Sequence, residues 1–281
     1  MKYKLIISDF DGTLADSGGR ASQTDLIPAP VLDAIDKFRQ AGGKFVVCSG
    51  RPTDTAHSVL NKAGLKPDAL ITYQGAIAFI GSEMVVNGGV KTDLASKIAK
   101  DIKDKFNRDC GTYISDAYYY EGDNPYTVGY ANFCISHGMT VKKVEDLSSF
   151  ITENGGVSQK LIVSKAPTEE LADVQNYVMQ NYGDKVVANS GAPTILEIVS
   201  VDYTKYTTSK FIAEKFGLKE EETVTIGDSS NDLTLIKFGV GCAVGDGSKE
   251  LIANADYVAP PIGEMPVKNI IDKILNNEDL V

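Results

Sequence analysis

The feature that most constrains the fold of this chain is the alternation of short apolar runs with amphipathic stretches near both of its ends. In the first eighty residues, segments 30–41 and 53–63 carry apolar residues at helical spacing, and each is followed by glycine. The apolar runs that flank them are predicted strands at 5–7, 44–48 and 69–72. Strand, helix, strand, helix, strand predicts a parallel sheet with right-handed crossovers.

The middle of the chain has a different pattern. From about residue 81 to 190, short tyrosine-rich strand-like pieces lie between helical pieces, the clearest at 168–182. The first pattern then returns, with expected helices at 205–216 and 230–238 and strands at 223–226 and 241–244. We therefore predict an α/β fold with a doubly wound, Rossmann-like parallel sheet. Residues 1–80 and 194–281 would form this core, and residues 81–193 an inserted α+β domain.

Charge and composition exclude several classes of protein. The formal net charge of −10 argues against nucleic acid and anionic membranes as partners. No apolar stretch approaches the ~18 residues of a membrane span, and residues 1–9 do not resemble a signal peptide. Four scattered cysteines (Cys48, Cys110, Cys134 and Cys242) lack metal-ligand spacing and are expected to be reduced core thiols. We expect a cytoplasmic protein.

Two carboxylates follow the first predicted strand, in Asp9-Phe10-Asp11-Gly12-Thr13. Their mutual repulsion and partial desolvation at a strand end are costly without a use. A divalent cation would relieve that repulsion, and an aspartate held beside it could attack phosphorus. Asp9 is the better candidate for nucleophile and metal ligand, and Asp11 for an acid that later activates water. An ordinary turn is the other interpretation, which this five-residue pattern disfavours.

Two weaker signals lie at comparable positions. Ser49-Gly50-Arg51-Pro52 follows the second strand, and its hydroxyl and glycine N–H would suit phosphate oxygens. Taken alone, this segment is better explained as the N-capping turn of the next helix. Lys205 begins a predicted helix, and only its location favours it over the neighbouring Lys210.

A fourth cluster, Gly227-Asp228-Ser229-Ser230-Asn231-Asp232, follows the predicted strand 223–226. Its oxygen ligands suit Mg²⁺. Asp, Ser and Asn also cap helices, but one of them would suffice for a cap. Ligands bind outside the carboxyl ends of parallel strands, so the four clusters are expected to meet there. His57 and His137 are far apart in the sequence and receive no role.

These clusters, in this order, resemble the haloacid dehalogenase superfamily of phosphotransferases. The matches to Asp-x-Asp-Gly-Thr at 9–13 and to Gly-Asp-x-x-Asn-Asp at 227–232 are complete. Ser49-Gly50-Arg51 fits the second motif and Lys205 the third. The long insert between them resembles the cap of the Cof-type branch, which holds many phosphatases of sugar phosphates and other small phosphorylated metabolites.

The sequence departs from that branch in three places. Tyr73-Gln74-Gly75-Ala76 stands where Asn-Gly is frequent, Lys205-Tyr206 replaces lysine-glycine, and Gly263-Glu264-Met265-Pro266-Val267 replaces an acidic residue, glycine and valine. The first and third changes concern substrate class more than chemistry.

The resemblance implies a Mg²⁺-dependent phosphatase that forms an aspartyl-phosphate on Asp9. Asp11 would act as acid and then base. Mg²⁺ would be held by Asp9, the Asp11 carbonyl and Asp228, supported by Asn231 and Asp232. Ser49, Gly50 and Lys205, with Gly12 and Thr13, would bind the phosphoryl group, and Arg51 is a candidate substrate contact.

Two alternatives stay open. A phosphomutase or phosphotransferase would pass the phosphoryl group to a sugar hydroxyl, and the core motifs do not separate it from a phosphatase. A non-enzymatic metabolite-binding protein could share the fold, although it would have no need of a nucleophile and an acid. An ion-pumping ATPase is excluded by the lack of a membrane span.

Overall fold

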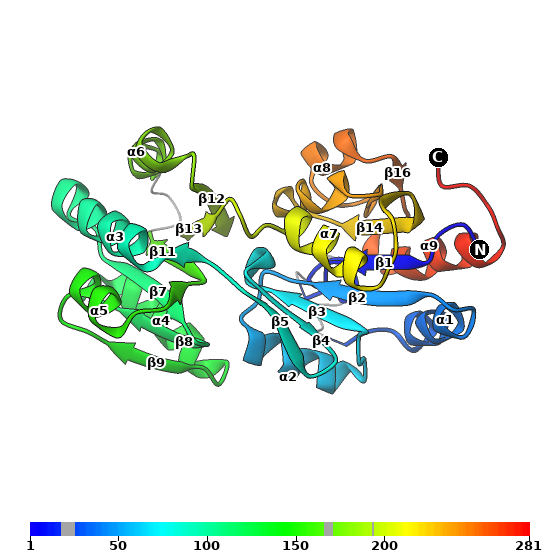
Figure 1. Ribbon diagram of the computed structural model, residues 1–281, viewed down its shortest axis with the longest axis horizontal. Helices are drawn as coiled ribbons and strands as arrows, with labels where there is room; N and C mark the ends of the chain where they lie inside the picture. Colours follow the sequence, from blue (N-terminus) through cyan, green and yellow to red (C-terminus); the bar gives the residue numbers. More distant parts are fainter. Residues whose placement is uncertain (18–25, 166–170, 193) are drawn as a thin grey trace. The chain divides into compact units, whose positions relative to one another are not determined.

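The structure, a computed structural model, describes residues 1–17, 26–165, 171–192 and 194–281. These form two compact units (Figure 1). The core unit comprises Met1–Arg51, Ala56–Val86 and Thr204–Val281, and the inserted unit comprises Pro52–Thr55 and Asn87–Tyr203.

The core unit is built on one sheet with the strand order β16-β15-β14-β1-β2-β3-β4-β5. Its first six members run parallel: β16 (Tyr257–Val258), β15 (Val240–Ala243), β14 (Thr223–Gly227), β1 (Leu5–Ser8), β2 (Lys44–Cys48) and β3 (Ala69–Thr72). β4 (Ile77–Ile80) pairs antiparallel with β3, and β5 (Glu83–Asn87) forms the edge. β1 lies centrally, with Leu5 opposite both Thr223 and Lys44.

Helices cover both faces of this sheet, so successive residues of β1 enter different cores. Ile6 packs in a cluster with residues of α1 (Ala29–Gln40), α2 (Thr53–Ala63) and α9 (Pro266–Leu275). Leu5 and Ile7 belong to a second cluster with residues of α7 (Lys205–Lys215). This burial on both faces explains the almost wholly apolar strands. The predicted doubly wound sheet is confirmed. The remaining helix, α8 (Lys249–Asn254), follows β15.

The inserted unit is an α+β domain, also as predicted. Its six-stranded sheet has the order β12-β13-β11-β7-β8-β9. The bounds are β7 (Cys110–Ile114), β8 (Ala117–Tyr120), β9 (Thr140–Lys143), β11 (Lys160–Ser164), β12 (Val186–Ala192) and β13 (Ile195–Ser200). All pairings are antiparallel except β8 with β9. Two short strands, β6 (Val90–Lys91) and β10 (Val157–Ser158), pair separately.

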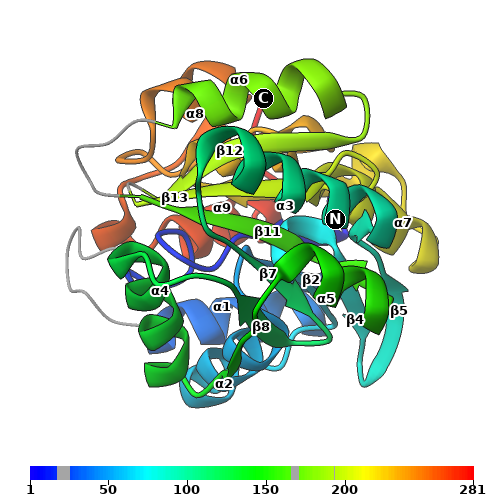
Figure 2. The same cartoon turned by 90° about the vertical axis from the view of Figure 1, so that its left-hand side faces the viewer.

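Three helices of the inserted unit share one apolar core with this sheet. They are α3 (Thr92–Phe106), α5 (Leu147–Asn154) and α6 (Ala172–Tyr182), and α3 and α5 lie in front of the sheet in Figure 2. α4 (Pro125–Ser136) instead contacts β8, β9 and β11. Residues 168–170, where we expected α6 to begin, lie outside the described residues.

Three sequence expectations differ from the structure. Residues 81–86, expected in the inserted domain, belong to the core unit, because β5 pairs beside β4 at the edge of the core sheet. Residues 195–200, expected in the core, form β13 of the inserted sheet, because β12 and β13 follow one another closely and pair as antiparallel neighbours. Residues 230–238 are not a helix but two 3₁₀ turns, Ser230–Asp232 and Leu235–Lys237. There the Asp232 side chain accepts hydrogen bonds from the backbone of residues 228 and 229, which fixes a tight turn in place of a helical start.

Candidate active site

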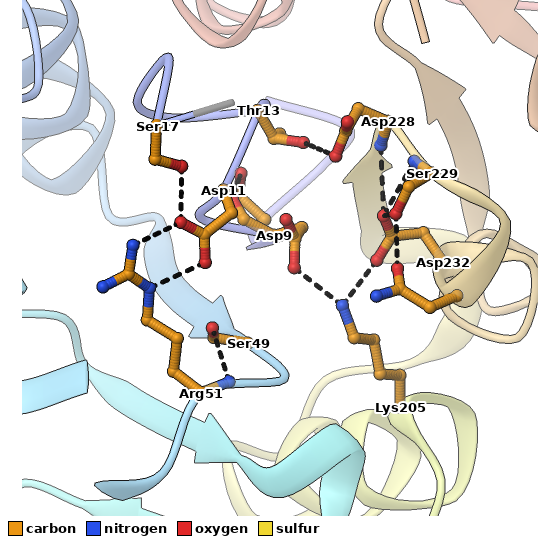
Figure 3. Close-up of polar contacts among 12 residues, drawn as sticks. Asp9, Asp11, Thr13, Ser17, Ser49, Arg51, Lys205, Asp228, Ser229 and Asp232 are labelled. Carbon is orange, nitrogen blue, oxygen red and sulfur yellow. Dashed lines mark hydrogen bonds and ion pairs between the residues drawn. The ribbon is translucent and has the colours of Figure 1, made fainter. Parts of the chain in front are cut away.

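Three of the four polar clusters follow parallel strands of the core sheet, and the fourth begins α7 (Figure 3). Asp9 comes directly after β1, Ser49 directly after β2, and Asp228 directly after β14. Lys205 is the first residue of α7. The structure thus brings residues from distant parts of the sequence to one edge of the sheet, as the rule for parallel α/β sheets predicts.

A buried lysine joins two of these clusters. Lys205 is 1% exposed, and its Nζ lies 2.7 Å from Asp9 Oδ1 and 2.5 Å from Asp232 Oδ1. The lysine is held there because its helix begins at it: Thr204 caps α7 in a reciprocal capping box with Thr207. A buried ammonium between two carboxylates is well paired, but it leaves the cluster with excess negative charge.

The excess negative charge affects the pKa of Asp9. Burial, followed by the neighbouring carboxylate of Asp232, raises the pKa of Asp9 well above its ordinary value, although Lys205 opposes the shift. For Lys205, burial acts to lower the pKa, but the carboxylates of Asp232 and Asp9 outweigh it and keep the pKa well above its ordinary value. The lysine therefore stays charged, and Asp9 sits where an additional cation would favour its ionised form.

The chain after Asp9 makes a tight turn. Thr13, Leu14 and Ala15 all donate their N–H groups to the Phe10 carbonyl, and Gly12 adopts a positive φ of 78°. This turn buries Thr13, whose hydroxyl donates to Asp228 Oδ1 at 3.2 Å. Glycine is needed at position 12 because other residues rarely adopt that backbone conformation. The turn thereby ties the first motif to the fourth.

Asp11 and Arg51 form a further ion pair of the site. Arg51 donates from Nε and Nη2 to the two carboxylate oxygens of Asp11, at 2.8 and 2.6 Å. The Ser17 hydroxyl donates to the same carboxylate, and the guanidinium lies 5.5 Å from the centre of the Phe10 ring. Asp11 thus points toward Arg51 rather than Lys205, so the two aspartates of the first motif have separate cationic partners (Figure 3).

The second motif is held by a strained turn after β3. The buried Ser49 hydroxyl accepts from the Arg51 N–H at 3.1 Å, and the Ser49 carbonyl accepts from Gln74 N–H at 3.3 Å. Tyr73 and Gln74 both have positive φ, 52° and 60°. A side chain at Gly50 would meet Gln74 Nε2 at 2.5 Å, so any larger residue there would displace the Gln74 side chain. This strain is of the kind that proteins keep at functional sites.

The fourth motif forms a turn around Asp232. Its Oδ2 accepts from the N–H groups of Asp228 and Ser229, each at 3.1 Å, while its Oδ1 is paired with Lys205. Asn231 is exposed, and its amide oxygen accepts from Ser229 Oγ at 2.6 Å. Asp232 is therefore fully engaged in shaping the turn that presents Asp228.

The donor set fits a hard divalent cation. One carboxylate oxygen from each of Asp9, Asp228 and Asp232 lies within 4.8 Å of the others. Carboxylate oxygens are the ligands Mg²⁺ prefers, and the cluster carries more negative charge than Lys205 neutralises. Because Asp232 is used by Lys205 and two backbone N–H groups, Asp9 and Asp228 are the better candidates for direct ligands.

Comparison with known proteins identifies the family. The model of the haloacid dehalogenase-like hydrolases matches residues 6–271. The chain belongs to this family. A relative from Bacillus subtilis, named "Putative phosphatase YxeH", is 23% identical, with 97% of this chain and 98% of the relative covered. A protein from Streptococcus pyogenes, named "Putative phosphatase M6_Spy0533", is 24% identical, with 99% of this chain and 100% of the relative covered.

Solved structures share the fold. A Thermotoga maritima protein superimposes with a TM-score of 0.79 at 26% identity, covering 96% of this chain and 97% of its own. A sugar phosphatase of haloacid dehalogenase subclass IIB gives a TM-score of 0.77 at 21% identity, covering 96% and 98%. The resemblance inferred from the four motifs is confirmed.

The sequence analysis missed part of the lining of this site. A cleft of about 630 Å³ is bordered by Asp11, Arg51 and Asp228, and also by Ser17, Asp246 and Ser248. Asp246 and Ser248 follow β15, so the rule of polar residues after a strand end could have found them. Asp246 also accepts from the N–H of Ile262, just before the segment 263–267 where the sequence departs from the Cof-type pattern.

Other expectations concern residues outside this cleft. All four cysteines are buried and unbridged, as expected for core thiols. His57 packs edge-on against Phe79, and His137 is exposed and does not line the cleft. Among the described residues, no helix has both the length and the apolar character to cross a membrane.

Proposed function

We propose that this member of the haloacid dehalogenase-like hydrolases is a Mg²⁺-dependent phosphatase of a small phosphomonoester, such as a sugar phosphate. The observation that carries the proposal is the buried Lys205 ammonium between Asp9 and Asp232, with Asp228 beside them. A binding protein has no need of so costly a cluster of buried charge. The phosphatase names of the relatives and the sugar phosphatase with the same fold support the same conclusion.

In the first step, an Asp9 carboxylate oxygen attacks phosphorus in line with the leaving oxygen. A bond forms between Asp9 and phosphorus, the bond from phosphorus to the leaving oxygen breaks, and Asp11 donates a proton to that oxygen. Lys205, the Ser49 hydroxyl and the Gly50 N–H hold the phosphoryl oxygens, with the turn of Gly12 and Thr13 beside them. Because Arg51 holds Asp11 in the present arrangement, Asp11 must exchange that partner to reach the leaving group.

In the second step, water attacks the aspartyl-phosphate. Asp11, now deprotonated, accepts the proton of the attacking water, and the bond between phosphorus and Asp9 breaks to release inorganic phosphate. Asp9 and Asp228, with the Asp11 carbonyl, would hold Mg²⁺, and Asp232 and Asn231 would support that shell. When bound, the ion supplies positive charge to the phosphoryl oxygens as negative charge develops.

The inserted unit is proposed to act as a cap. It interrupts the core between the second motif and Lys205, and the chain crosses into and out of it near residues 87 and 203. A lid of this kind would exclude water from the intermediate and select the leaving group. Exchange of the inserted unit for that of a relative should change the substrate profile, and an unchanged profile would contradict the cap role.

The nucleophile is tested by Asp9→Asn. An amide cannot attack phosphorus, so turnover should fall by more than about 10³-fold, with the circular dichroism spectrum unchanged. Phosphate release from a panel of phosphorylated metabolites is the measurement, and Asp33→Asn on the exposed face of α1 is the matched control. Acid quenching with labelled substrate should trap the label on Asp9 in the native chain. Substantial turnover by a folded Asp9→Asn variant would refute the assignment.

The metal is tested by removal and return. Exhaustive chelation should abolish phosphate release, and added Mg²⁺ should restore it. Full activity in the chelated protein would contradict the metal site.

Labelled substrate separates a phosphatase from a phosphomutase, because a hydrolase releases free phosphate and a mutase transfers label to a second sugar.

A further inference from the structure

A second cavity lies wholly within the inserted unit, in the described residues between α4 and the ends of β11 and β13. It has a volume of about 530 Å³, within the range of small-molecule sites. Tyr126, Tyr130 and Phe133 of α4 form one wall, and Ser164, Lys165 and Ile195 contribute from the strands. None of these residues belongs to the active site described above.

The wall formed by α4 is unusual for a surface helix. Its twelve residues include no charged side chain, and it lies apart from α3 and α5 (Figure 2). Tyr126 and Phe133, both at the cavity, are 44% and 55% exposed. Tyr130 is fixed by a hydrogen bond of 2.8 Å between its hydroxyl and that of Tyr113, and its ring lies nearly parallel to that of Phe133. A wall of two exposed aromatic rings beside a fixed Tyr130 suits a ligand with a ring of its own.

The strand side of the cavity supplies polar groups. Ser164 is 5% exposed, and its buried hydroxyl has no hydrogen-bond partner among the residues that the structure describes. Leu161 and Val163 of β11 point into the core with α3, α5 and α6, so Ser164 faces the other side of the sheet. A buried, unsatisfied hydroxyl is costly, and a ligand group that bonds to it removes the cost. Lys165 adds positive charge at the same position.

We propose that this cavity is a binding site for a small molecule that combines a planar ring with an acidic group. The ring would lie against Tyr126, Tyr130 and Phe133, and the acidic group would be bound by Ser164 and Lys165. The proposal concerns the inserted unit alone and does not depend on the proposed phosphatase activity.

The test is calorimetric titration of the full chain with 2-naphthalenesulfonate, which has a planar ring and an acidic group. We expect saturable one-to-one binding, and binding at least fivefold weaker for the neutral 2-naphthalenemethanol. Phe133→Ser should weaken binding of the sulfonate about tenfold, and Lys165→Gln or Ser164→Ala about fivefold, as expected for loss of one stacking or hydrogen-bonding partner. Ser164→Ala should not lower thermal stability, because it removes an unsatisfied group.

Two controls locate the probe. Ile135→Ser changes another exposed apolar residue of α4 that does not line the cavity, and it should leave the affinity unchanged. Saturating inorganic phosphate should not displace the probe. Absence of saturable binding, equal affinity in the Phe133, Ser164 and Lys165 variants, or displacement by phosphate would each overturn the proposal.

Discussion

At the scale of single residues, Lys205 has the most demanding environment in the core unit. Its ammonium is removed from water and is stabilised by two carboxylates at hydrogen-bond distance. A buried charge is tolerated only with such partners. The buried carboxylates of Asp9 and Asp232 in turn need the Lys205 ammonium as their counter-charge. The same residue therefore serves both the stability of the strand ends and the proposed binding of a phosphoryl group.

We predict that Lys205→Met destabilises the protein by about 3–5 kcal/mol, because it leaves Asp9 and Asp232 buried without their cation. Urea unfolding followed by circular dichroism measures the change. Lys210→Met, an exposed position on the same helix, is the matched control and should have little effect. Combining Lys205→Met with Asp232→Asn should recover part of the loss. A cost below about 1 kcal/mol would show that the ion pairs are not needed for folding.

At the scale of elements, the start of α7 connects a local capping motif to the chemistry of the site. The Thr204 hydroxyl accepts from Thr207 N–H at 3.1 Å, and the Thr207 hydroxyl accepts from Thr204 N–H at 2.8 Å. This capping box fixes the first turn of the helix, and Lys205 is the first residue of that turn. A change in the cap should therefore affect catalysis as well as stability.

We expect Thr204→Ala to cost about 1 kcal/mol of stability and to lower kcat for phosphate release, because Lys205 loses its fixed starting point. Thr204→Ser, which keeps the hydroxyl, should retain most of both. Asp146→Ala removes the corresponding N-cap of α5 in the inserted unit and should cost similar stability without lowering kcat. A Thr204→Ala variant that is destabilised but has native kcat would separate the cap from the site.

At the scale of the whole molecule, single side chains connect several elements of the core unit. Asp68, just before β3, accepts from the Phe45 N–H at the start of β2 and pairs with Arg39 of α1 and Lys44 of β2. Burial acts to raise the pKa of Asp68, but the Phe45 N–H, Lys44 and Arg39 together lower it below its ordinary value. Asp68 therefore stabilises the fold at neutral pH, and this stabilisation is lost in acid.

The pH dependence of the stability that Asp68 contributes can be tested. A carboxyl with a depressed pKa stabilises the fold fully above its unfolded pKa of about 4, and the stabilisation is lost as pH falls through the lower folded pKa. Asp68→Asn should thus be less stable than the native chain at pH 7, and the difference should shrink below about pH 4. Urea midpoints measured at pH 7, 5 and 3 check this. Asp36→Asn, an exposed partner of the same arginine, should change stability by less than about 0.5 kcal/mol. A difference that is constant with pH would contradict the role of Asp68.

Much of the fold could be predicted because its signals are local. The apolar runs and helical spacing around Ile6, Val47 and Ile71 predicted the parallel sheet, and burial on both of its faces is what made those runs continuous. The turn residues after each strand predicted where the polar clusters would lie. The predicted helix at 230–238 was wrong because the Asp232 side chain, which the pattern suggested as a cap or ligand, competes for the backbone and fixes a 3₁₀ turn.

The sequence by itself therefore determined the fold class, the family and the residues at the strand ends, since all of these follow from short-range patterns and motif identity. Only the tertiary structure decided how charges were paired: Asp9 with Lys205, 196 residues later, and Asp11 with Arg51. It also decided that β13 joins the inserted sheet and that Ser164 lines a cavity with α4. These features depend on which strands and helices become neighbours, and burial of the whole chain selects those neighbours rather than any one segment of sequence.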